Sequence, residues 1–324
     1  MIILTGGSGF IGSVMLRRLN EAGYGYHEVM VVDIFESWAK LYNMRGKRFK
    51  FCEKNSFFDV LGLGLKPSDI DAIIHLGAMT STTETNWDLL KRANLEYSRV
   101  LAEWSIENGK RFIYASSAAT YGDGSHGFSD SNDNTKLLKP LNLYGESKQK
   151  CDLWLIENGF DKLVCGFKFF NVFGPNEYHK GPMASLAFKA YHQIAKEGAL
   201  LLFKSADPRY KDGEFKRDFI YVMDAVDVVM WALENPSVNG IFNLGTGKAR
   251  SWNDLAASLF DAMDKPRQII YIDMPANVRE QYQYFTEADM TKLRAAGYTK
   301  PFQELEDSVK DYVRNYLMQP NPYY

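Results

Sequence analysis

The chain has 324 residues, of which 46% are hydrophobic and 24% are charged, and its formal net charge is -2 at pH 7. This length suffices for one large core with a second lobe. Lys and Arg are scattered along the sequence, which argues against a nucleic-acid partner.

Three further absences in the sequence narrow the class of protein. No apolar run approaches the roughly 20 residues that span a bilayer, and no signal peptide precedes the first apolar run. Cys52, Cys151 and Cys165 are isolated from one another, so neither a disulfide framework nor a metal site is expected. We therefore expect a cytoplasmic protein with no membrane partner.

The first elements enclose a glycine motif. Residues 1–4 form a short apolar run that predicts a buried parallel strand, and apolar residues at helical spacing predict a helix over 10–22. Between them stand Gly6, Gly9 and Gly12 in the spacing G-x-x-G-x-x-G. They suit a tight turn, close approach of backbone to phosphate, and close packing of helix on strand, respectively. The motif predicts a site for a dinucleotide pyrophosphate at the helix N-terminus.

A second apolar strand, over 29–32, ends at Asp33, 21 residues after Gly12. An acidic residue at this distance is expected to bind the adenosine ribose. The alternative is an ordinary glycine-rich turn followed by a surface Asp.

The rest of the first half alternates strands with helices. Strands are predicted over 49–52, 70–75, 111–115 and 163–167, and helices over 87–108 and 144–158. This alternation predicts an α/β fold of the Rossmann type, a doubly wound parallel sheet with ligands at the carboxyl ends of its strands. The segments 75–78 and 115–118 fall at such ends.

After Asn171 the pattern loosens, which predicts a smaller, discontinuous α/β substrate lobe. We assign residues 1–171 to a dinucleotide-binding domain, to which 215–248 return through strands over 217–222 and 241–245. Residues 172–214 and 249–324 are assigned to the substrate-binding lobe.

Tyr144 and Lys148 are candidate chemical groups. Four residues apart on a helix, their side chains lie on one face. A nearby ammonium favours an ionised phenol, so Tyr144 is expected to act as an acid or base near neutral pH. Ser117, 27 residues earlier, is expected to donate a hydrogen bond to the same substrate oxygen. The alternative is a structural Tyr-x-x-x-Lys pair.

Taken together, these motifs resemble the extended short-chain dehydrogenases/reductases, the group of nucleotide-sugar epimerases and dehydratases. The matching segments cover essentially the whole chain and are 5–12, 116–122, 144–148, 170–175, 217–222 and 242–247. Within the group, the ADP-heptose epimerases of lipopolysaccharide core precursor synthesis are similar in segments 81–84, 179–181, 183–185, 215–219 and 293–298.

The resemblance implies a reaction. Hydride leaves C6 of the heptose for a nicotinamide cofactor and returns to the other face of the resulting aldehyde, which inverts the carbon. Two faces argue for two acid/base groups. The resemblance assigns these roles to Tyr144 and Lys180, with Lys148 and Ser117 as their catalytic partners. The alternative for Lys180 is a lysine that neutralises the sugar diphosphate.

The resemblance also implies binding residues and no metal site. For the cofactor they are Gly6, Gly9, Phe10, Ile11, Gly12, Asp33, Ile34, Lys40, Leu76, Gly77, Ala78, Asn94, Tyr144, Lys148 and Val172. For the substrate they are Ser81, Ser117, Asn171, Lys180, Phe203, Arg217 and Tyr282. Arg217 is the candidate diphosphate clamp, because its planar fork can bind phosphate oxygens bidentately. Its alternative is an ordinary surface ion pair.

The choice of cofactor depends on two residues. Asp33 favours NAD, because it binds a free ribose 2′-hydroxyl and repels a 2′-phosphate. The resemblance nonetheless implies NADP, with Lys40 placed to bind the phosphate, and we prefer NADP over NAD.

Other functions stay open at this point. A UDP-hexose 4-epimerase or a nucleotide-sugar dehydratase is one alternative, although Ala118-Ala119-Thr120 replaces the acidic pair of dehydratases. A non-catalytic dinucleotide-binding regulatory protein is another. Pro182 and the stretch 206–214 depart from the epimerase pattern and leave the sugar and the nucleotide base open. The resemblance further implies a homo-oligomer, with a pentamer as one candidate.

Overall fold

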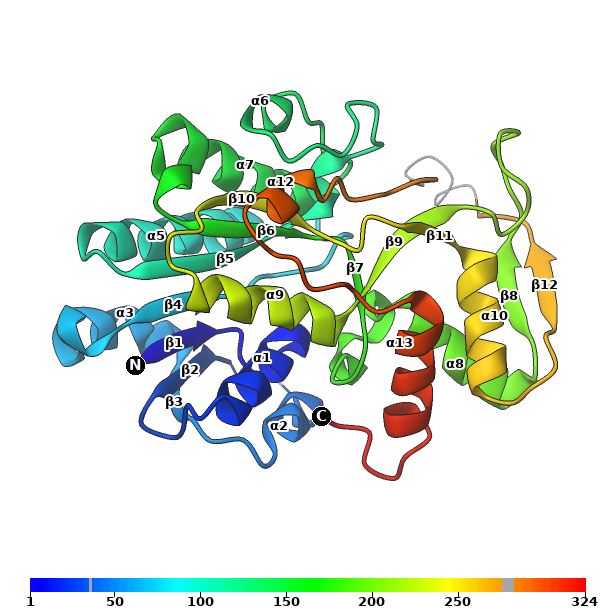
Figure 1. Cartoon of the computed structure of the whole chain (residues 1–324), viewed down its shortest axis with the longest axis horizontal. Coiled ribbons are helices and arrows are strands. Elements are labelled where there is room, and N and C mark those ends of the chain that lie inside the picture. The colour runs from blue at the N-terminus through cyan, green and yellow to red at the C-terminus, as the bar shows by residue number, and fades with distance from the viewer. Residues whose placement is uncertain (35–36, 276–282) are drawn as a thin grey trace.

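Seven parallel strands form one sheet in the order β10-β6-β5-β4-β1-β2-β3 (Figure 1). The computed structural model describes residues 1–34, 37–275 and 283–324. The strands are β1 (Ile2–Thr5), β2 (Val29–Asp33), β3 (Lys50–Glu53), β4 (Ala72–His75), β5 (Arg111–Ser117), β6 (Cys165–Phe169) and β10 (Gly240–Leu244). The chain runs outward in opposite directions from β1 and β4, which confirms the predicted doubly wound sheet and sets its ligand crevice between them.

Helices cover both faces of this sheet, as its apolar strands require. On one face Ile2 and Leu4 pack with helices α1 (Phe10–Glu21) and α9 (Val222–Glu234). On the other face Ile3 packs with helices α5 (Tyr97–Glu107) and α7 (Leu143–Glu157). Because successive side chains of a strand point to opposite faces, this short apolar run serves both cores.

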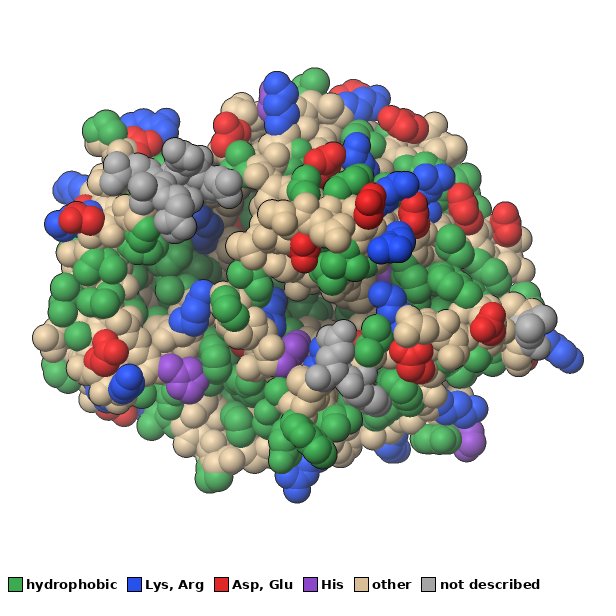
Figure 2. Space-filling model, turned by 180° about the vertical axis from the view of Figure 1, so that it is seen from behind, with side chains coloured by type: hydrophobic (Ala, Val, Ile, Leu, Met, Phe, Trp, Pro, Cys, Tyr) green, Lys and Arg blue, Asp and Glu red, His purple; other side chains and the backbone are tan. Residues whose placement is uncertain are grey.

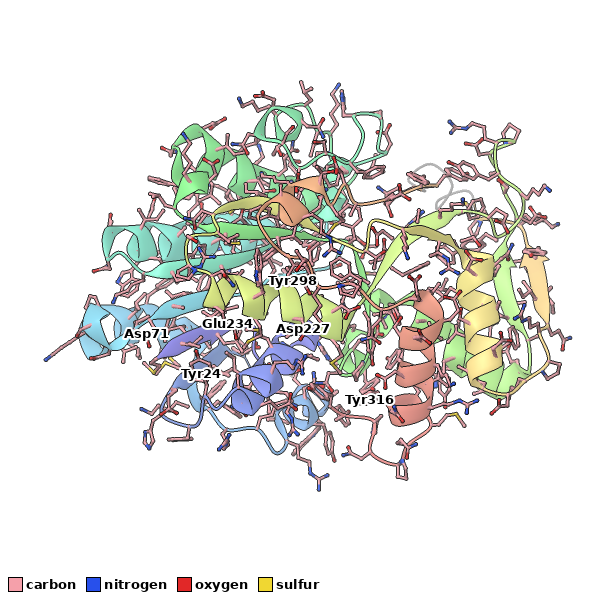
Figure 3. The ribbon with its side chains drawn as sticks, viewed as in Figure 1. Tyr24, Asp71, Asp227, Glu234, Tyr298 and Tyr316 are labelled. Carbon is pink, nitrogen blue, oxygen red and sulfur yellow. The ribbon has the colours of Figure 1, made fainter. Side chains whose placement is uncertain are left out.

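The outer edges of α1 and α9 are joined by charged groups. Asp227 of α9 accepts a hydrogen bond from Nε of Arg18 in α1 at 3.1 Å, and it also forms an ion pair with Lys300. Figure 3 shows Asp227 on this face, with Tyr298 close by. The segment around residue 300 is thereby fastened to the first domain.

The second lobe lies beyond the carboxyl ends of the large sheet (Figure 1). Its elements come from separate stretches of sequence, as predicted: α8 (Leu186–Glu197), β8 (Leu200–Phe203), α10 (Trp252–Ala262), β12 (Ile269–Ile272) and α13 (Leu305–Tyr312). Strand β12 pairs with β8 in parallel. The exact limits of the two domains stay a prediction.

The two strands expected to return to the first domain behave differently. Strand β10 joins the large sheet beside β6. Strand β9 (Lys216–Tyr221) instead forms a separate three-stranded sheet with β7 (Asn171–Phe173) and β11 (Ala249–Ser251). The sequence pattern did not specify the sheet that each strand joins, and the assignment of residues 215–248 to the first domain stays a prediction.

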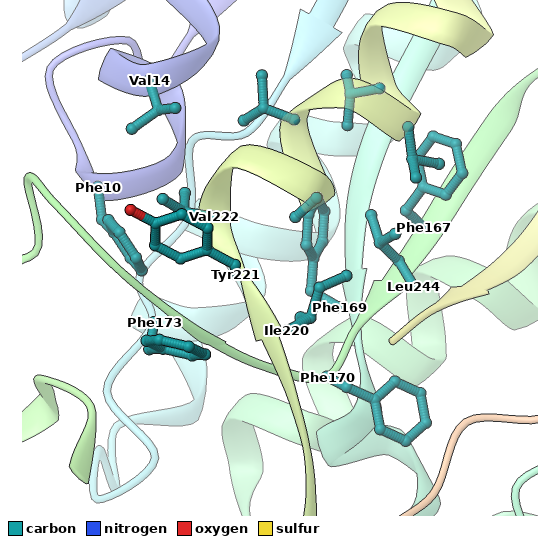
Figure 4. Packing of buried hydrophobic residues seen from close by; sticks show 14 of the residues in the cluster. Phe10, Val14, Phe167, Phe169, Phe170, Phe173, Ile220, Tyr221, Val222 and Leu244 are labelled. Carbon is teal, nitrogen blue, oxygen red and sulfur yellow. The ribbon is translucent and has the colours of Figure 1, made fainter. Parts of the chain in front are cut away.

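Aromatic side chains fill the junction between the lobes (Figure 4). Phe173 of β7 and Tyr221 of β9 have ring centroids 5.5 Å apart, and both side chains are buried. Phe10, at the start of α1, belongs to the same cluster. The glycine motif and the second lobe therefore share one core.

The helix predicted over 87–108 is continuous but changes its winding. It comprises α4 (Trp87–Leu90), a π-helical segment η4 (Lys91–Glu96) and α5. The remaining helices are α2 (Trp38–Met44), α3 (Phe57–Asp59), α6 (Asn132–Thr135) and α12 (Thr291–Ala295). The remaining short 3-10 and π segments are η1 (Lys54–Ser56), η2 (Val60–Gly64), η3 (Pro67–Asp69), η5 (Ala118–Tyr121), η6 (Phe160–Lys162), η7 (Tyr178–Met183) and η8 (Val313–Leu317).

Across the described ranges, none of these helices has both the length and the apolar character needed to cross a bilayer.

Candidate active site

A cavity of about 680 Å³ lies at the carboxyl ends of β1, β4 and β5 and extends into the second lobe. Figure 2 shows the molecule hollowed on this side, with hydrophobic side chains and several Lys or Arg side chains along the hollow. Predicted residues in the cavity lining are Phe10, Ile11, Leu76, Ala78, Ser117, Tyr144, Lys148, Asn171, Val172, Lys180, Phe203 and Arg217. Residues far apart in the sequence thus meet at the predicted edge of the sheet.

The glycine motif fits a dinucleotide. A Cβ on Gly12 would overlap the carbonyl oxygen of Gly6, and a Cβ on Gly6 would lie 2.5 Å from Cα of Gly77. Gly6 also has φ of +71°, which favours glycine. Gly9 precedes α1 without a side chain to cap the helix, so its first backbone N–H groups face the turn. This cradle suits a pyrophosphate.

Asp33 stands at the end of β2, as predicted for a ribose-binding acid. Its Oδ2 accepts the backbone N–H of Ser8 at 2.8 Å, and its Oδ1 accepts that of Ile34 at 2.7 Å. Lys40 of α2 places Nζ 3.7 Å from the Asp33 carboxylate and 3.5 Å from the carbonyl oxygen of Ile34. Asp33 and Lys40 therefore meet beside the glycine turn.

Tyr144 and Lys148 lie on one face of α7, as predicted. Lys148 is buried and donates a hydrogen bond from Nζ to the carbonyl oxygen of Ala115 at 2.8 Å. Burial lowers the pKa of Lys148. Ser117 ends β5, and its hydroxyl accepts the backbone N–H of Ala119 at 3.1 Å. Because the Ser117 oxygen accepts this bond, its hydroxyl proton is available for the hydrogen bond with the Tyr144 phenol.

The expected depression of the Tyr144 pKa by Lys148 is wrong for the protein alone. The pKa of Tyr144 is raised, because burial outweighs the opposing effect of its hydrogen bond with Ser117. Burial disfavours a charged phenolate, and the spacing of Tyr144 and Lys148 in the sequence does not report burial. Ser117 is thus a closer electrostatic partner of the phenol than Lys148.

Lys180 lines the same cavity as Tyr144. It lies in η7, which is kinked at Gly181, where φ is +51°. Its Nζ is 5.5 Å from the centroid of the Phe10 ring, at the start of α1. Burial lowers the pKa of Lys180, which eases release of its proton. Tyr144 and Lys180 thus approach the cavity from different elements, α7 and η7.

Arg217, the candidate diphosphate clamp, is buried at the cavity wall and is already engaged. Its guanidinium donates to the carbonyl oxygens of Lys216, at 2.9 Å, and of Gln283. Asn171 lines the cavity and accepts a long hydrogen bond, 3.5 Å, from the hydroxyl of Thr286. Tyr282 lies outside the described residues.

Two predicted contact residues are placed differently. Asn94 is fully buried, and its amide bonds the backbone of Met79 twice and the hydroxyl of Ser147 once, at 2.8 to 3.0 Å. It thus braces the loop after β4. Ser81 bonds Thr83 at 3.1 Å, while its neighbours Thr80 and Thr82 line the cavity.

Several lining residues were missed from the sequence. They include Thr80, Thr82, Lys189, Phe219 and Trp252. The two threonines stand beside the predicted Ser81, so their neighbourhood was a usable signal. Trp252 and Lys189 reach the cavity only through the folding of the second lobe, which no local pattern reports.

Known proteins are similar to this chain over its full length. It is 52% identical over 324 residues, 100% of both chains, to "ADP-L-glycero-D-manno-heptose-6-epimerase" of Nitratidesulfovibrio vulgaris (strain DP4). It is 44% identical over 333 residues, again 100% of both, to a protein of that name from Fusobacterium nucleatum.

A solved structure and a family agree with these relatives. The crystal structure of the Helicobacter pylori protein with that name is 27% identical, with a TM-score of 0.82 over 97% of this chain and 95% of that one. Residues 2–245 match the NAD dependent epimerase/dehydratase family. With its doubly wound sheet, glycine cradle and Tyr144–Lys148 helix, the chain belongs to the NAD dependent epimerase/dehydratase family.

Proposed function

We propose that this protein inverts C6 of ADP-D-glycero-D-manno-heptose to give the L-glycero epimer, by transient oxidation and re-reduction at that carbon. One observation carries the proposal: Tyr144, Ser117 and Lys180 line a single cavity beside the glycine cradle. The names of the full-length relatives supply the sugar and the nucleotide.

The protein's residues divide the work between holding a cofactor and moving protons. Gly6, Gly9 and Gly12 would hold the pyrophosphate, and Asp33 would hold the adenosine ribose. A bound nicotinamide supplies reversible hydride transfer, which protein side chains lack.

Tyr144 handles the proton on one face of C6: it removes the hydroxyl proton when that epimer is oxidised and returns one when that epimer is formed. Burial raises the pKa of the phenol, and a hydrogen bond with Ser117 opposes part of this rise. Lys148 lies one helical turn after Tyr144 in α7, and the carbonyl oxygen of Ala115 holds its Nζ at 2.8 Å.

Lys180 serves the opposite face of the aldehyde. Inversion presents the C6 oxygen from a second direction, and Lys180 lines the cavity from η7 while Tyr144 lines it from α7. Its pKa is lowered by burial, so it can give up a proton more readily than an exposed lysine.

We further propose NADP as the preferred nicotinamide cofactor. Asp33 alone would repel a 2′-phosphate, but Lys40 lies 3.7 Å from its carboxylate and offsets that charge. The ammonium of Lys40 is a suitable partner for the phosphate.

Lys40→Ala is expected to weaken NADP binding on the order of 10-fold and to leave NAD binding nearly unchanged, because only NADP carries the 2′-phosphate. Titration calorimetry with both dinucleotides measures this. Lys40→Arg keeps the charge and serves as the matched control. Equal losses for NADP and NAD in Lys40→Ala would contradict the placement and favour NAD.

A panel of nucleotide sugars tests the proposed reaction. The protein should convert ADP-D-glycero-D-manno-heptose to the C6 epimer, as read by proton NMR, and should leave UDP-glucose and UDP-galactose unchanged. Conversion of the UDP-hexoses alone would make it a hexose 4-epimerase. The proposed homo-oligomer is checked on the same sample by size-exclusion chromatography with light scattering.

A further inference from the structure

A pair of opposite charges is buried beside Ser117. Lys168 of β6 and Asp152 of α7 have fully buried side chains, and Nζ lies 2.7 Å from Oδ2. Two charges removed from water repay their desolvation only with good geometry and further hydrogen bonds. Stability is therefore a weak explanation for this buried pair, and its other contacts show what it holds.

Both members of the buried pair reach the turn that carries Ser117. Oδ2 of Asp152 accepts the hydroxyl of Ser116, the preceding residue, at 2.7 Å. Nζ of Lys168 donates to the hydroxyl of Thr120 at 3.0 Å. That hydroxyl in turn donates to the carbonyl oxygen of Ser117 at 2.8 Å. Ser117 is thus tethered from both sides.

The same carboxylate belongs to the helix of the candidate catalytic residues. Tyr144, Lys148 and Asp152 follow one another at intervals of four residues in α7, so they share one face of the helix. Asp152 therefore ties the Ser117 turn at the end of β5 to the helix that carries the phenol.

We infer that the buried pair Asp152–Lys168 is a positioning unit that holds the hydroxyl of Ser117 against the phenol of Tyr144. The inference rests on the proposed function only in taking Tyr144 as the acid/base group. Neither member of the pair lines the cavity, so both act through Ser116 and Thr120.

Other titratable groups around the buried pair do not replace its charges. Burial lowers the pKa of His75 on β4 and raises the pKa of Tyr114 on β5 and of Tyr121 in η5, so these three are neutral near pH 7. Burial lowers the pKa of Lys148 on α7, and its Nζ bonds the carbonyl oxygen of Ala115 and not the buried pair. The link to Ser117 therefore depends on the pair itself.

Thr120→Val tests the link while sparing the buried pair. It removes the hydroxyl between Lys168 and the Ser117 carbonyl at nearly constant volume. We expect kcat to fall on the order of 10- to 100-fold with little change in KM, because the groups are displaced rather than lost. The pKa of Tyr144 should rise, since the bond from Ser117 lowers it. Thr120→Ser keeps a hydroxyl and should restore both values.

The pKa of Tyr144 can be followed without turnover. Protein labelled with ¹³C at tyrosine Cζ is titrated by NMR, and the signal of Tyr144 is assigned as the one absent from Tyr144→Phe. Asp152→Asn should raise this pKa as Thr120→Val does. If Asp152→Asn does not fold, Ser116→Ala, which removes one tether and leaves the pair, takes its place.

Tyr114→Phe is the matched control. Tyr114 donates to the other oxygen of the carboxylate, Oδ1 of Asp152, at 2.8 Å, and this bond does not lead to Ser117. We expect an unchanged kcat and an unchanged Tyr144 titration, even where the melting temperature falls.

Two results would overturn the positioning role. One is a Thr120→Val variant with the kcat and the Tyr144 pKa of the wild type. The other is a Tyr114→Phe control whose kcat falls as far as that of Thr120→Val. The titration also separates this inference from the proposed function. If the wild type inverts no ADP-heptose but the variants show the expected changes in the Tyr144 pKa, the proposed function is contradicted and the positioning unit is supported.

Discussion

Tyr144→Phe is expected to lower the rate of C6 inversion by a factor on the order of 100 or more, because general acid/base groups contribute at least that much. The fold should survive, since the phenyl ring keeps its place on α7. Cofactor binding should also persist, because the glycine cradle and Asp33 are untouched. Steady-state kinetics and dinucleotide titration of the same sample measure these quantities.

The pH dependence provides a further check on Tyr144. Burial raises the pKa of Tyr144, so its phenol is mainly protonated near neutral pH in the protein alone. The base form, needed for oxidation, therefore increases as the pH rises toward that pKa, and the wild-type rate should rise with it. Tyr144→Phe should lack this rise. Near-normal turnover in the variant would remove Tyr144 from the mechanism.

Lys180→Met is expected to impair inversion strongly, on the order of 100-fold in kcat, while substrate binding weakens only modestly. Methionine keeps the length of the apolar stem, so the packing near Phe10 is largely retained. A lysine that only contacts phosphate would behave differently, because its loss raises KM with little change in kcat. Substrate kinetics distinguish the two roles.

An aldehyde analogue of the C6 intermediate tests whether the two groups serve opposite faces. Tyr144→Phe and Lys180→Met are each supplied with the analogue, and the stereochemistry of the redox products is determined. Each variant should lose one C6 configuration of the product more than the other configuration. Identical product ratios in both variants and in the wild type would contradict the assignment of two bases.

The first half of the fold could be predicted because its signals are local. The apolar run 1–4, the glycine turn and Asp33 can each be recognised from a few neighbouring residues. The structure confirms that the strands before and after the turn and its helix, β1 and β2, are neighbours in the sheet. The relation of Tyr144 to Lys148 is likewise local, since it depends only on helix geometry.

What escaped prediction depends on long-range contacts. Strand β9 has the same apolar pattern whether it pairs with the large sheet or with β7 and β11, and only the three-dimensional structure decides. The raised pKa of Tyr144 comes from burial, which is a property of the assembled site.

The buried pair did leave a signal in the sequence. Lys168 is a charged residue inside the otherwise uncharged strand Cys165–Phe169, where an unpaired ammonium would be costly. Its partner could not be read from the sequence, because β6 and α7 meet only through the packing of helix on sheet.

The proposed reaction inverts C6 by removing one hydride and returning it. Its most direct test uses ADP-D-glycero-D-manno-heptose carrying deuterium at C6, incubated with the wild-type protein in ordinary water and read by NMR and mass spectrometry. We expect the L-glycero product with the deuterium still at C6. Recovery of uninverted sugar, or an inverted product whose deuterium has been replaced by a solvent proton, would contradict it.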